Sequence, residues 1–378
     1  MTIFSVKYRK VQDYPFTYLS EFGPHYRAGQ YNTAVGIKSL EPSTGSNNTA
    51  YGYHSLLVNT TGINNTAVGT SSLVANTTGN YNTGIGWASL NKTTTGESNT
   101  ACGSNALQEN TTGGSNTASG VEALYSNTTG SANLAFGVQS LRANTTGTRQ
   151  TAIGYRALYT TQTSEDNTAV GYQALFDNTT GNDNTAVGRS ALQENTTGDG
   201  NIALGNSAGS SLTTGDHNIC IGNVGVAAES STIRIGDSDQ TKAYIAGIRG
   251  VTTGASDAVA VLIDSNGQLG QTSSSLRYKE DVTTMGDMSA RLQELHAVTF
   301  RYKKPADDGT KPLQYGLIAE QVHEVMPELV VYDREGRPDA IQYHILPSLL
   351  LNEVQRLRQE NDDLEERLTR LEDRLSRR

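Results

Sequence analysis

A short serine-rich segment contains the residue types of a nucleophile and its base. Residues 273 to 275 are three consecutive serines, and Lys279 follows five residues after Ser274. A serine hydroxyl attacks a carbonyl group only when a base removes its proton, and lysine serves as that base only in its neutral form. A lysine with the ordinary pKa of about 10.4 is neutral in roughly one molecule in 2,500 at pH 7. A working Ser/Lys pair therefore requires a closed, desolvated site that lowers the lysine pKa.

The five-residue spacing between Ser274 and Lys279 limits how the two side chains can meet. Residues five apart lie about 140° apart on a helix and on opposite faces of a strand. Neither regular element brings such a pair together. We therefore expect either a sharp bend of the chain between them or a pair formed by residues of two different subunits. In both cases the chemistry has to wait for correct folding and assembly.

The residues around this segment carry a resemblance to a known family. The run Ser-Ser-Ser-Leu-Arg-Tyr-Lys-Glu-Asp-Val at 273 to 282 is followed, in order, by Val-Thr-Phe-Arg-Tyr-Lys, Tyr-Gly-Leu-Ile-Ala-Glu-Gln-Val, Pro-Glu-Leu-Val and a terminal helix pattern. This series covers about 105 residues. It resembles the intramolecular chaperone auto-processing domain, which is found at the C-terminus of phage endosialidases and other tail fibres and in a membrane-tethered transcription factor.

The resemblance implies roles for three residues. In that family a serine attacks the peptide bond just before itself, helped by a lysine five residues on, and the mature fibre is released from its folding clamp. By this resemblance Ser274 is the nucleophile, Lys279 is the base, and the cleaved bond joins Ser273 to Ser274; of the three serines, only Ser274 has a lysine at this spacing. The implied activity is a single-turnover self-cleaving endopeptidase without a metal or cofactor. The alternative is a serine-rich linker before a solvated charged segment.

The region from 346 to 378 predicts a long helix with Pro347 in its first turn. Asn361 occupies an a position of a heptad seam, and Arg367 and Glu372 occupy flanking g and e positions. We predict a coiled coil, and we predict a trimer from the resemblance as much as from the heptads, because such an asparagine also occurs in dimers. The seam residues alternate in steps of four and three: Leu350, Val354, Leu357, Asn361, Leu364, Leu368, Leu371 and Leu375.

Residues 274 to 345 predict a small α+β chaperone domain between the serine segment and this helix. Acidic residues are scattered over it, and His323 and His344 show no spacing typical of a metal site, so no metal is expected. The predicted elements are a short helix at 287–295, a strand at 298–303, a helix at 316–326 that ends before Pro327, and a hairpin of strands at 329–333 and 339–343.

Most of the preceding chain consists of one seventeen-residue block repeated twelve times. The block reads Asn-Thr-Ala-Val-Gly-x-x-Ala-Leu-x-x-Asn-Thr-Thr-Gly-x-x, and a short fixed period of this kind indicates a stacked array instead of a globule. Position 1 of the repeat falls at Asn32, Asn48, Asn65, Asn82, Asn99, Asn116, Asn133, Gln150, Asn167, Asn184, Asn201 and Asn218.

Two turn signals divide each block, a glycine at position 5 and the Asn-Thr-Thr-Gly segment from position 12. The segments between them have the length of strands and are too short for helices. Stacked coils would align like residues, which buries columns of Ala and Leu and lets the Asn amides form a hydrogen-bonded ladder. We therefore predict a mainly β fold: a trimeric β-solenoid or triple β-spiral shaft over residues 31 to 228, then the α+β chaperone domain and a trimeric coiled coil.

Position 4 of the repeat is mostly apolar, although one coil is too small to enclose it. We expect these side chains to form a second buried column shared with neighbouring chains around an axis. The repeats resemble the heads of trimeric autotransporter adhesins, whose shorter block also reads Ala-x-Gly-x-x-Ala, and the shafts of phage fibres. The adhesins end in a membrane-anchoring β-barrel that this sequence lacks, which favours a phage fibre. The position 4 residues include Val68, Ile85, Phe136, Val170, Leu204 and Ile221.

Aromatic side chains recur at position 6 of the repeat, at Tyr53, Trp87, Tyr155 and Tyr172. An exposed line of aromatic rings can stack on sugars, so these residues are candidate receptor contacts; the alternative is packing against neighbouring coils or chains. Residues 1 to 30 are also rich in aromatic side chains and lie outside the repeat. They are expected either to cap the open edge of the solenoid or to attach to a tail or baseplate protein.

The composition excludes several classes of protein. The 378 residues are only 35% hydrophobic and include 39 glycines, which is too little apolar material for large globular cores. The net charge of −9 and the lack of a basic stripe make nucleic acid an unlikely partner. No apolar run reaches the length of a signal peptide or a membrane span. Residues 229 to 273 predict a β connector, with strands at 231–236, 243–248 and 260–270.

These features together predict a homotrimeric bacteriophage tail fibre that is assembled in the host cytoplasm and becomes part of the virion. Its receptor would be a glycan or protein on the host surface. Two alternatives stay open, a bacterial cell-surface trimeric adhesin with the same chaperone and a polysaccharide-degrading tailspike. The tailspike is disfavoured because the repeats contain no recurring Asp/Glu pair of the kind that glycoside hydrolysis requires.

Overall fold

The computed structural model describes residues 29–41, 43–248, 254 and 256–377. The chain divides into two compact units, one up to residue 249 and one from residue 250 onward. The predicted cap or attachment segment, residues 1 to 30, lies almost entirely outside the described residues.

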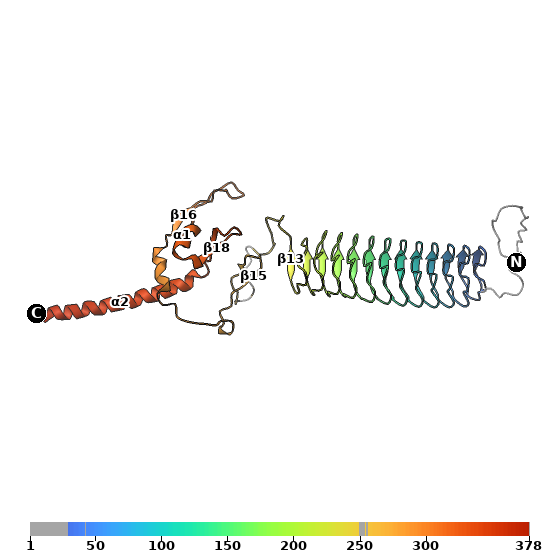
Figure 1. The fold of residues 1–378 in the computed structure, drawn as a ribbon, viewed down its shortest axis with the longest axis horizontal. Coiled ribbons are helices and arrows are strands. Elements are labelled where there is room, and N and C mark those ends of the chain that lie inside the picture. Colours follow the sequence, from blue (N-terminus) through green and yellow to red (C-terminus); the bar gives the residue numbers. More distant parts are fainter. Residues whose placement is uncertain (1–28, 42, 249–253, 255, 378) are drawn as a thin grey trace, which may run out of the picture. The chain divides into compact units, whose positions relative to one another are not determined.

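The repeat array folds as a parallel β-solenoid in which every block makes one coil and contributes one strand (Figure 1). All thirteen strands belong to one sheet in chain order, and each pairs in register with its neighbours along the chain. The solenoid is therefore confirmed, and the intertwined triple spiral is not what this chain forms. The strands are β1 (Thr33–Val35), β2 (Thr49–Tyr51), β3 (Thr66–Val68), β4 (Thr83–Ile85), β5 (Thr100–Cys102), β6 (Thr117–Ser119), β7 (Leu134–Phe136), β8 (Thr151–Ile153), β9 (Thr168–Val170), β10 (Thr185–Val187), β11 (Ile202–Leu204), β12 (Ile219–Ile221) and β13 (Ile233–Ile235).

The expectation of two strand-length segments per coil is wrong. Only three residues of each coil are extended, and the segment that contains the recurrent leucine is a turn. After β5, for example, Asn105 and Leu107 have φ angles of 59° and 52°, in the left-handed region that ends a strand. Left-handed backbone costs roughly 1–2 kcal/mol for a residue with a side chain, whereas burying a leucine contributes roughly 1.5–3 kcal/mol. Leu107 is fully buried, so burial offsets the strain.

The core of the solenoid consists of the predicted Ala and Leu columns. In β3 the middle residue, Ala67, is fully buried while Thr66 and Val68 point outward, as alternation along a strand requires. Leu73, Leu90 and the equivalent leucines of later coils are likewise fully buried. A second column of small residues at position 8, which includes Ala106 and Ala123, is also fully buried. Because like residues stack directly on each other, these few small columns and the leucines are enough to exclude water.

The asparagines at position 1 form a buried ladder that connects each coil to the next. Oδ1 of Asn99 accepts a hydrogen bond of 3.0 Å from the backbone N–H of Asn116, and Nδ2 of Asn116 donates to the carbonyl of Gly130 at 2.8 Å. Each amide therefore satisfies backbone groups that no strand partner reaches, as buried polar groups require. The predicted asparagine ladder is confirmed, with backbone N–H groups as its main donors.

A second ladder at position 12 is interrupted wherever the sequence departs from asparagine. Asn127 donates to Oδ1 of Asn110 at 2.9 Å, and the pattern continues to Asn144. Thr161 then takes the next position, and Leu212 follows Asn195 in the same way. The buried Oδ1 atoms of Asn144 and Asn195 consequently have no hydrogen-bond partner among the described residues.

The glycine at position 5 is required by the close stacking of coils. Gly103 has a φ of 146°, and a Cβ atom built on it would lie 2.4 Å from the carbonyl oxygen of Gly120 in the next coil. Both the backbone angle and the lack of space exclude other residues. This explains why glycine recurs there in every block.

Position 4 of the repeat is not covered within the chain. Phe136, Leu204 and Ile85 are 58%, 50% and 42% exposed, respectively. The expected second buried column is therefore absent from the single chain, and its burial between chains stays a prediction.

The connector contains less regular structure than predicted. The expected strand at 231–236 is present as β13, which pairs with β12 and adds one strand beyond the twelve repeats. The expected strand at 243–248 is wrong, since those residues form no strand. Within 260–270 the chain forms the short antiparallel hairpin of β14 (Leu262–Ile263) and β15 (Leu269–Gly270).

The second unit also contains a small α+β domain and a long terminal helix. Its core is formed by Val322, Met326, Leu329, Val330 and Leu349. No helix among the described residues has both the length and the apolarity that crossing a membrane would require. The elements are the 3₁₀ helices η1 (Leu276–Tyr278), η2 (Gly286–Glu294) and η3 (Pro327–Leu329), the hairpins β16 (Val298–Phe300) with β17 (Gln314–Gly316) and β18 (Val330–Tyr332) with β19 (Pro338–Ile341), and the helices α1 (Ala319–Val325) and α2 (Leu346–Ser376).

Most predicted elements of this domain are present with shifted bounds. The helix expected at 287–295 is the 3₁₀ helix η2, and the helix expected at 316–326 begins only at Ala319. Residues up to Gly316 are extended because they pair with β16, a long-range contact that the local pattern does not reveal. The hairpin around Glu-Gly-Arg-Pro and the terminal helix are confirmed.

Replacing Asn116 by alanine tests the ladder. The change leaves the backbone N–H of Asn133 without its buried acceptor, and the carbonyl of Gly130 loses one of its two side-chain donors and keeps only Asn127. We therefore expect a loss of roughly 1–3 kcal/mol in the free energy of unfolding. Thermal melting of the shaft, followed by circular dichroism, measures this loss. Thr112→Ala is the control, because its exposed side chain makes no hydrogen bond among the described residues. Equal melting of both variants would contradict a structural role for the ladder.

Candidate functional site

A single turn of 3₁₀ helix separates Ser274 from Lys279. Ser275 precedes this helix, η1, and its Oγ atom accepts hydrogen bonds from the backbone N–H and the Nε atom of Arg277, at 3.4 and 3.1 Å. The turn closes with the backbone N–H of Lys279 donating to the carbonyl of Leu276 at 3.2 Å. The chain therefore contains a sharp bend between the two residues, which is one of the two arrangements that their spacing allows.

The Ser274 and Lys279 side chains are both exposed in the single chain. Neither makes a side-chain hydrogen bond among the described residues. Ser273 is exposed as well, and its Oγ atom accepts a hydrogen bond of 3.3 Å from the backbone N–H of Ser275. The bend is thus formed, while the desolvated surroundings that a neutral lysine needs are not present in one chain. The catalytic roles and the cleaved bond stay predictions.

Helix α2 contacts the domain through one face of its first turns. Glu353 is buried there and accepts hydrogen bonds from Ser289 Oγ at 3.0 Å and from Gln293 Nε2 at 2.6 Å, both in η2. Arg356 forms an ion pair with the same carboxylate at 2.7 Å, and Asn352 donates to Ser289 Oγ at 2.7 Å. This polar cluster fixes the start of α2 on the domain.

The charge of Glu353 is strongly favoured in this position. Hydrogen bonds from the Arg356 guanidinium and the Gln293 amide lower the pKa of Glu353 to about 2, and burial opposes them only in part. At neutral pH the carboxylate is therefore ionised and fully engaged. Sequence analysis missed this cluster, because Glu353 looks like any other charge beside a heptad seam.

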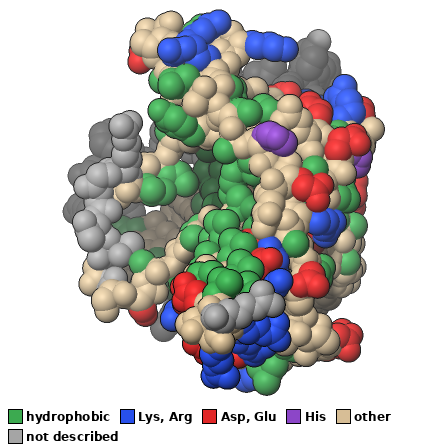
Figure 2. All heavy atoms as spheres, turned by 90° about the vertical axis from the view of Figure 1, so that its left-hand side faces the viewer, with side chains coloured by type: hydrophobic (Ala, Val, Ile, Leu, Met, Phe, Trp, Pro, Cys, Tyr) green, Lys and Arg blue, Asp and Glu red, His purple; other side chains and the backbone are tan. Residues whose placement is uncertain are grey.

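The predicted seam of α2 faces away from these contacts. Leu350, Val354, Leu364 and Leu375 are 52%, 62%, 53% and 72% exposed, and Asn361 is exposed too. In Figure 2, which views the side at which α2 ends, hydrophobic side chains lie open at the surface among arginine and acidic side chains. A helix with one face on its domain and an apolar stripe left open is suited to binding further helices.

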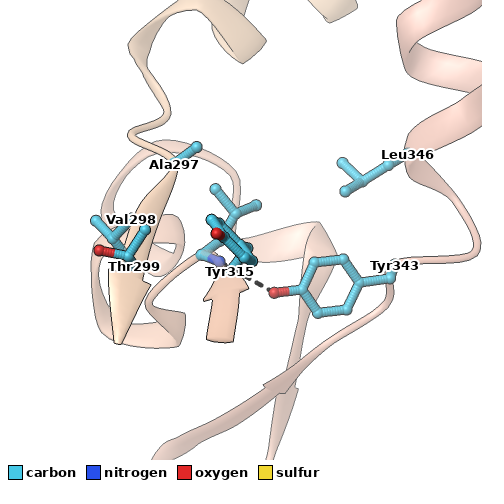
Figure 3. A pocket seen from close by; sticks show the side chains of 8 residues that line it. Ala297, Val298, Thr299, Tyr315, Tyr343 and Leu346 are labelled. Atoms are coloured by element: carbon cyan, nitrogen blue, oxygen red, sulfur yellow. Dashed lines mark hydrogen bonds between the residues drawn. The ribbon is translucent and has the colours of Figure 1, made fainter. Parts of the chain in front are cut away.

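An open pocket lies beside the β16–β17 hairpin. Figure 3 shows Tyr343, which precedes α2, and Leu346, the first residue of α2, opposite residues of β16 and β17. The Tyr343 hydroxyl accepts a hydrogen bond of 3.0 Å from the backbone N–H of Leu317. The lining includes neither Ser274 nor Lys279 and contains no acidic or basic side chain. We assign no catalytic role to this pocket.

The four candidate receptor aromatics are not equivalent. Tyr155 and Tyr172 stack on each other with ring centroids 5.4 Å apart, and the guanidinium groups of Arg156 and Arg189 lie over the two rings. Stacking within the shaft covers ring faces that a sugar would need. Trp87 is 56% exposed and has no ring partner among the described residues, so it fits receptor contact better.

A second aromatic column was not singled out from the sequence. Tyr159 stacks on Phe176 at 5.2 Å, and Arg142 lies over the rings of Tyr125 and Tyr159. These residues share position 10 of the repeat, so the seventeen-residue spacing of Tyr159 and Phe176 was the signal that could have found them. These aromatic residues, together with Tyr155 and Tyr172, pack along the length of the shaft, whereas Trp87 does not.

Comparison with known proteins finds one match. Residues 274–331 match the family model described as the chaperone of endosialidase. No curated protein matches the chain, and no solved structure does. The match begins at Ser274 and covers η1, η2, the β16–β17 hairpin, α1 and η3.

Acidification should loosen the contact between α2 and η2. The folded-state pKa of Glu353, about 2, lies below the ordinary value of 4.5, so its stabilising effect is present above pH 4.5 and is lost as the pH falls toward 2. We expect the melting temperature of the second unit, measured by circular dichroism, to fall over this range. A Glu353→Gln variant should lose part of that pH dependence. The same pH profile in both proteins would contradict the assignment.

Proposed function

We propose that this chain is the subunit of a homotrimeric fibre, most simply a bacteriophage tail fibre, whose C-terminal domain aligns three chains and then cleaves itself off. The observation that carries the proposal is the match to the chaperone of endosialidase, which starts at the residue expected to begin the released fragment. The long solenoid before it and the open heptad seam after it are the parts that such a chaperone would align.

The proposed cleavage uses Ser274 and Lys279. The Lys279 amine takes the proton of the Ser274 hydroxyl, and Oγ attacks the carbonyl carbon of Ser273. An ester forms between this carbonyl and Oγ while the peptide C–N bond breaks, and the departing Ser274 nitrogen receives the proton. Water then hydrolyses the ester, which releases the shaft with Ser273 at its end. Each chain performs this reaction once.

In this proposal, assembly of the trimer supplies the desolvated surroundings that the reaction needs and that the single chain does not provide. Both side chains are exposed, although the base has to be desolvated to be neutral. In the proposed trimer the three domains lie against each other through the α2 seams and enclose the site. The lysine acts on the serine of its own chain or on that of a neighbour; both routes make cleavage depend on correct assembly.

The shaft provides a reason for such a clamp. Its coils are nearly identical, so sliding one chain past another by seventeen residues loses contacts only at the ends. The α2 seam, with Asn361 at an a position, instead specifies one alignment. Removing the clamp after folding leaves the shaft kinetically trapped, because the route back to the unfolded chains is removed.

The fibre would connect a virus particle with the surface of its host. In this proposal residues 1 to 30 attach to a tail or baseplate protein or cap the first coil, and the shaft binds a glycan or protein receptor. Trp87 is the best candidate contact of the four position 6 aromatics, because its ring is open. Binding of the purified fibre to bacterial cells, compared with a Trp87→Ala variant, tests this part.

Cleavage is tested by the mass of the purified protein. We expect the wild-type chain to split into two fragments, the second beginning with Ser274, whereas Ser274→Ala and Lys279→Ala variants stay at full length. Lys279→Arg should also stay intact, because a guanidinium does not act as a base at neutral pH. Ser273→Ala is the matched control and should be cleaved. If all variants behave alike, the assignment of the pair is wrong.

The seam is tested in a Ser274→Ala background, in which α2 stays attached. Leu364→Asn places a second polar residue in the seam, and we expect sedimentation analysis to show dissociation of the trimer into monomers. Glu366→Asn, at an exposed position outside the seam, is the matched control and should stay trimeric. A wild-type chain that sediments as a monomer would contradict the proposed trimer.

A further inference from the structure

The outward face of the solenoid sheet changes character in its last three coils. Positions 2 and 4 of each repeat point outward from the strand, and position 2 is threonine from β1 to β10 except in β7, where Leu134 precedes Phe136. In β11, β12 and β13 both outward positions are instead apolar. The six side chains are Ile202, Leu204, Ile219, Ile221, Ile233 and Ile235.

These side chains are not covered by the chain itself. Leu204 and Ile202 are 50% and 44% exposed, and Ile233 and Ile235 are 66% and 73% exposed. The backbones of β11 and β12 pair with a strand on either side, whereas β13 is the last strand of the sheet and pairs only with β12. A contiguous exposed apolar surface of this kind is typical of a protein contact.

The two edges of this face carry opposite charge. Because the strands are parallel, the residues before each strand lie along one edge, the amino edge, and the residues after it lie along the other, the carboxyl edge. Arg156 and Arg189 lie on the carboxyl edge after β8 and β10. The amino edge before β9 to β12 carries Glu165, Asp166, Asp183, Asp199 and Asp216. Glu165 and Asp166 already form ion pairs with Arg149 on the same edge, which leaves Asp183, Asp199 and Asp216 without an ion-pair partner among the described residues.

Asp183 and Arg189 are the clearest such pair. They lie before and after the same strand, β10, and both side chains are exposed. Neither has an ion-pair partner among the described residues, although Arg189 lies over the ring of Tyr172. Two opposite charges at the same height on opposite edges can both form ion pairs when other copies of the chain lie alongside in the same orientation.

We infer that copies of this chain contact each other through this face, with the last three coils as the main apolar contact and Arg189 of one copy beside Asp183 of the next. The inference rests on the proposed trimer. When three parallel shafts turn the same face to a common axis, the carboxyl edge of each meets the amino edge of its neighbour. The charges of the two edges are then complementary. This contact lies upstream of Ser274, so it remains when the clamp is removed.

Cysteine cross-linking tests the contact in the full chain. We would place Leu204→Cys in a Ser274→Ala, Cys102→Ser background, because Cys102 is exposed on the same face and Cys220 is buried. A short bismaleimide should link Leu204→Cys between subunits. Glu194→Cys, exposed half a coil away from the strand, is the matched control and should stay unlinked. Linkage of Leu204→Cys no stronger than that of the control overturns the inference.

Exchanging the charges of Arg189 and Asp183 tests whether the two edges pair between copies of the chain. Arg189→Asp or Asp183→Arg alone should make the cleaved shaft dissociate on the order of tenfold faster, because a symmetric trimer loses three pairs at once. The double variant should restore the wild-type rate. Single variants that match the wild type, or a double variant that is worse than both, contradict the pairing of these edges.

Replacing the apolar position 2 residues of the last three coils by threonine, the usual residue at that position, tests the main apolar contact. Ile202→Thr, Ile219→Thr and Ile233→Thr together restore the usual position 2 residue, so each coil should keep its fold. The cleaved shaft should then separate into folded monomers at a lower temperature than wild type; an unchanged temperature counts against the contact.

A chain that is monomeric even with its clamp attached contradicts the proposed trimer, whereas a trimer without Leu204→Cys linkage contradicts only this inference.

Discussion

Each coil of the shaft depends on the next one to satisfy its buried polar groups. The carbonyl oxygen of one asparagine amide accepts the backbone N–H of the following coil, and its nitrogen donates to a glycine carbonyl. The cost of an unsatisfied buried amide holds adjacent coils in register within the chain. The same pattern recurs at every step, so it contains no information about which coil of one chain should lie beside which coil of another.

Because the shaft does not specify how its chains are aligned, three features of the second unit can be explained together. The α2 seam is open, the start of α2 is fixed to its domain by Glu353, and the Ser274/Lys279 segment is bent but exposed. The contacts of Glu353 are complete in one chain, whereas the seam and the Ser274/Lys279 segment are not. In the proposed fibre the alignment of three chains completes both, so that cleavage takes place only after correct assembly.

The periodicity of the sequence predicted the features that recur in every coil, and it missed the features that depend on contacts between different segments of the chain. The Ala, Leu and Asn columns were predicted because stacking places like residues above each other. The second strand of each coil was predicted wrongly, since burial of leucines such as Leu107 outweighs the strain of left-handed backbone. The start of α1 was placed too early, because residues before Ala319 pair with a distant strand. Around the candidate site the spacing allowed either a bend or a pair formed between two subunits. The turn between Ser274 and Lys279, and its capping by Ser275, became visible only in the structure.

The amino-acid sequence by itself determined the stacked β architecture, the columns of its core, the heptad seam and the Ser/Lys segment, because each depends on residue type at a fixed spacing. The tertiary structure decided which surfaces stay open. It leaves the seam, the position 4 column and the last three coils uncovered, and it covers Tyr155 and Tyr172 with each other and with two arginines. The exposure of a side chain depends on which segments contact it in three dimensions, and a local sequence pattern does not specify those contacts.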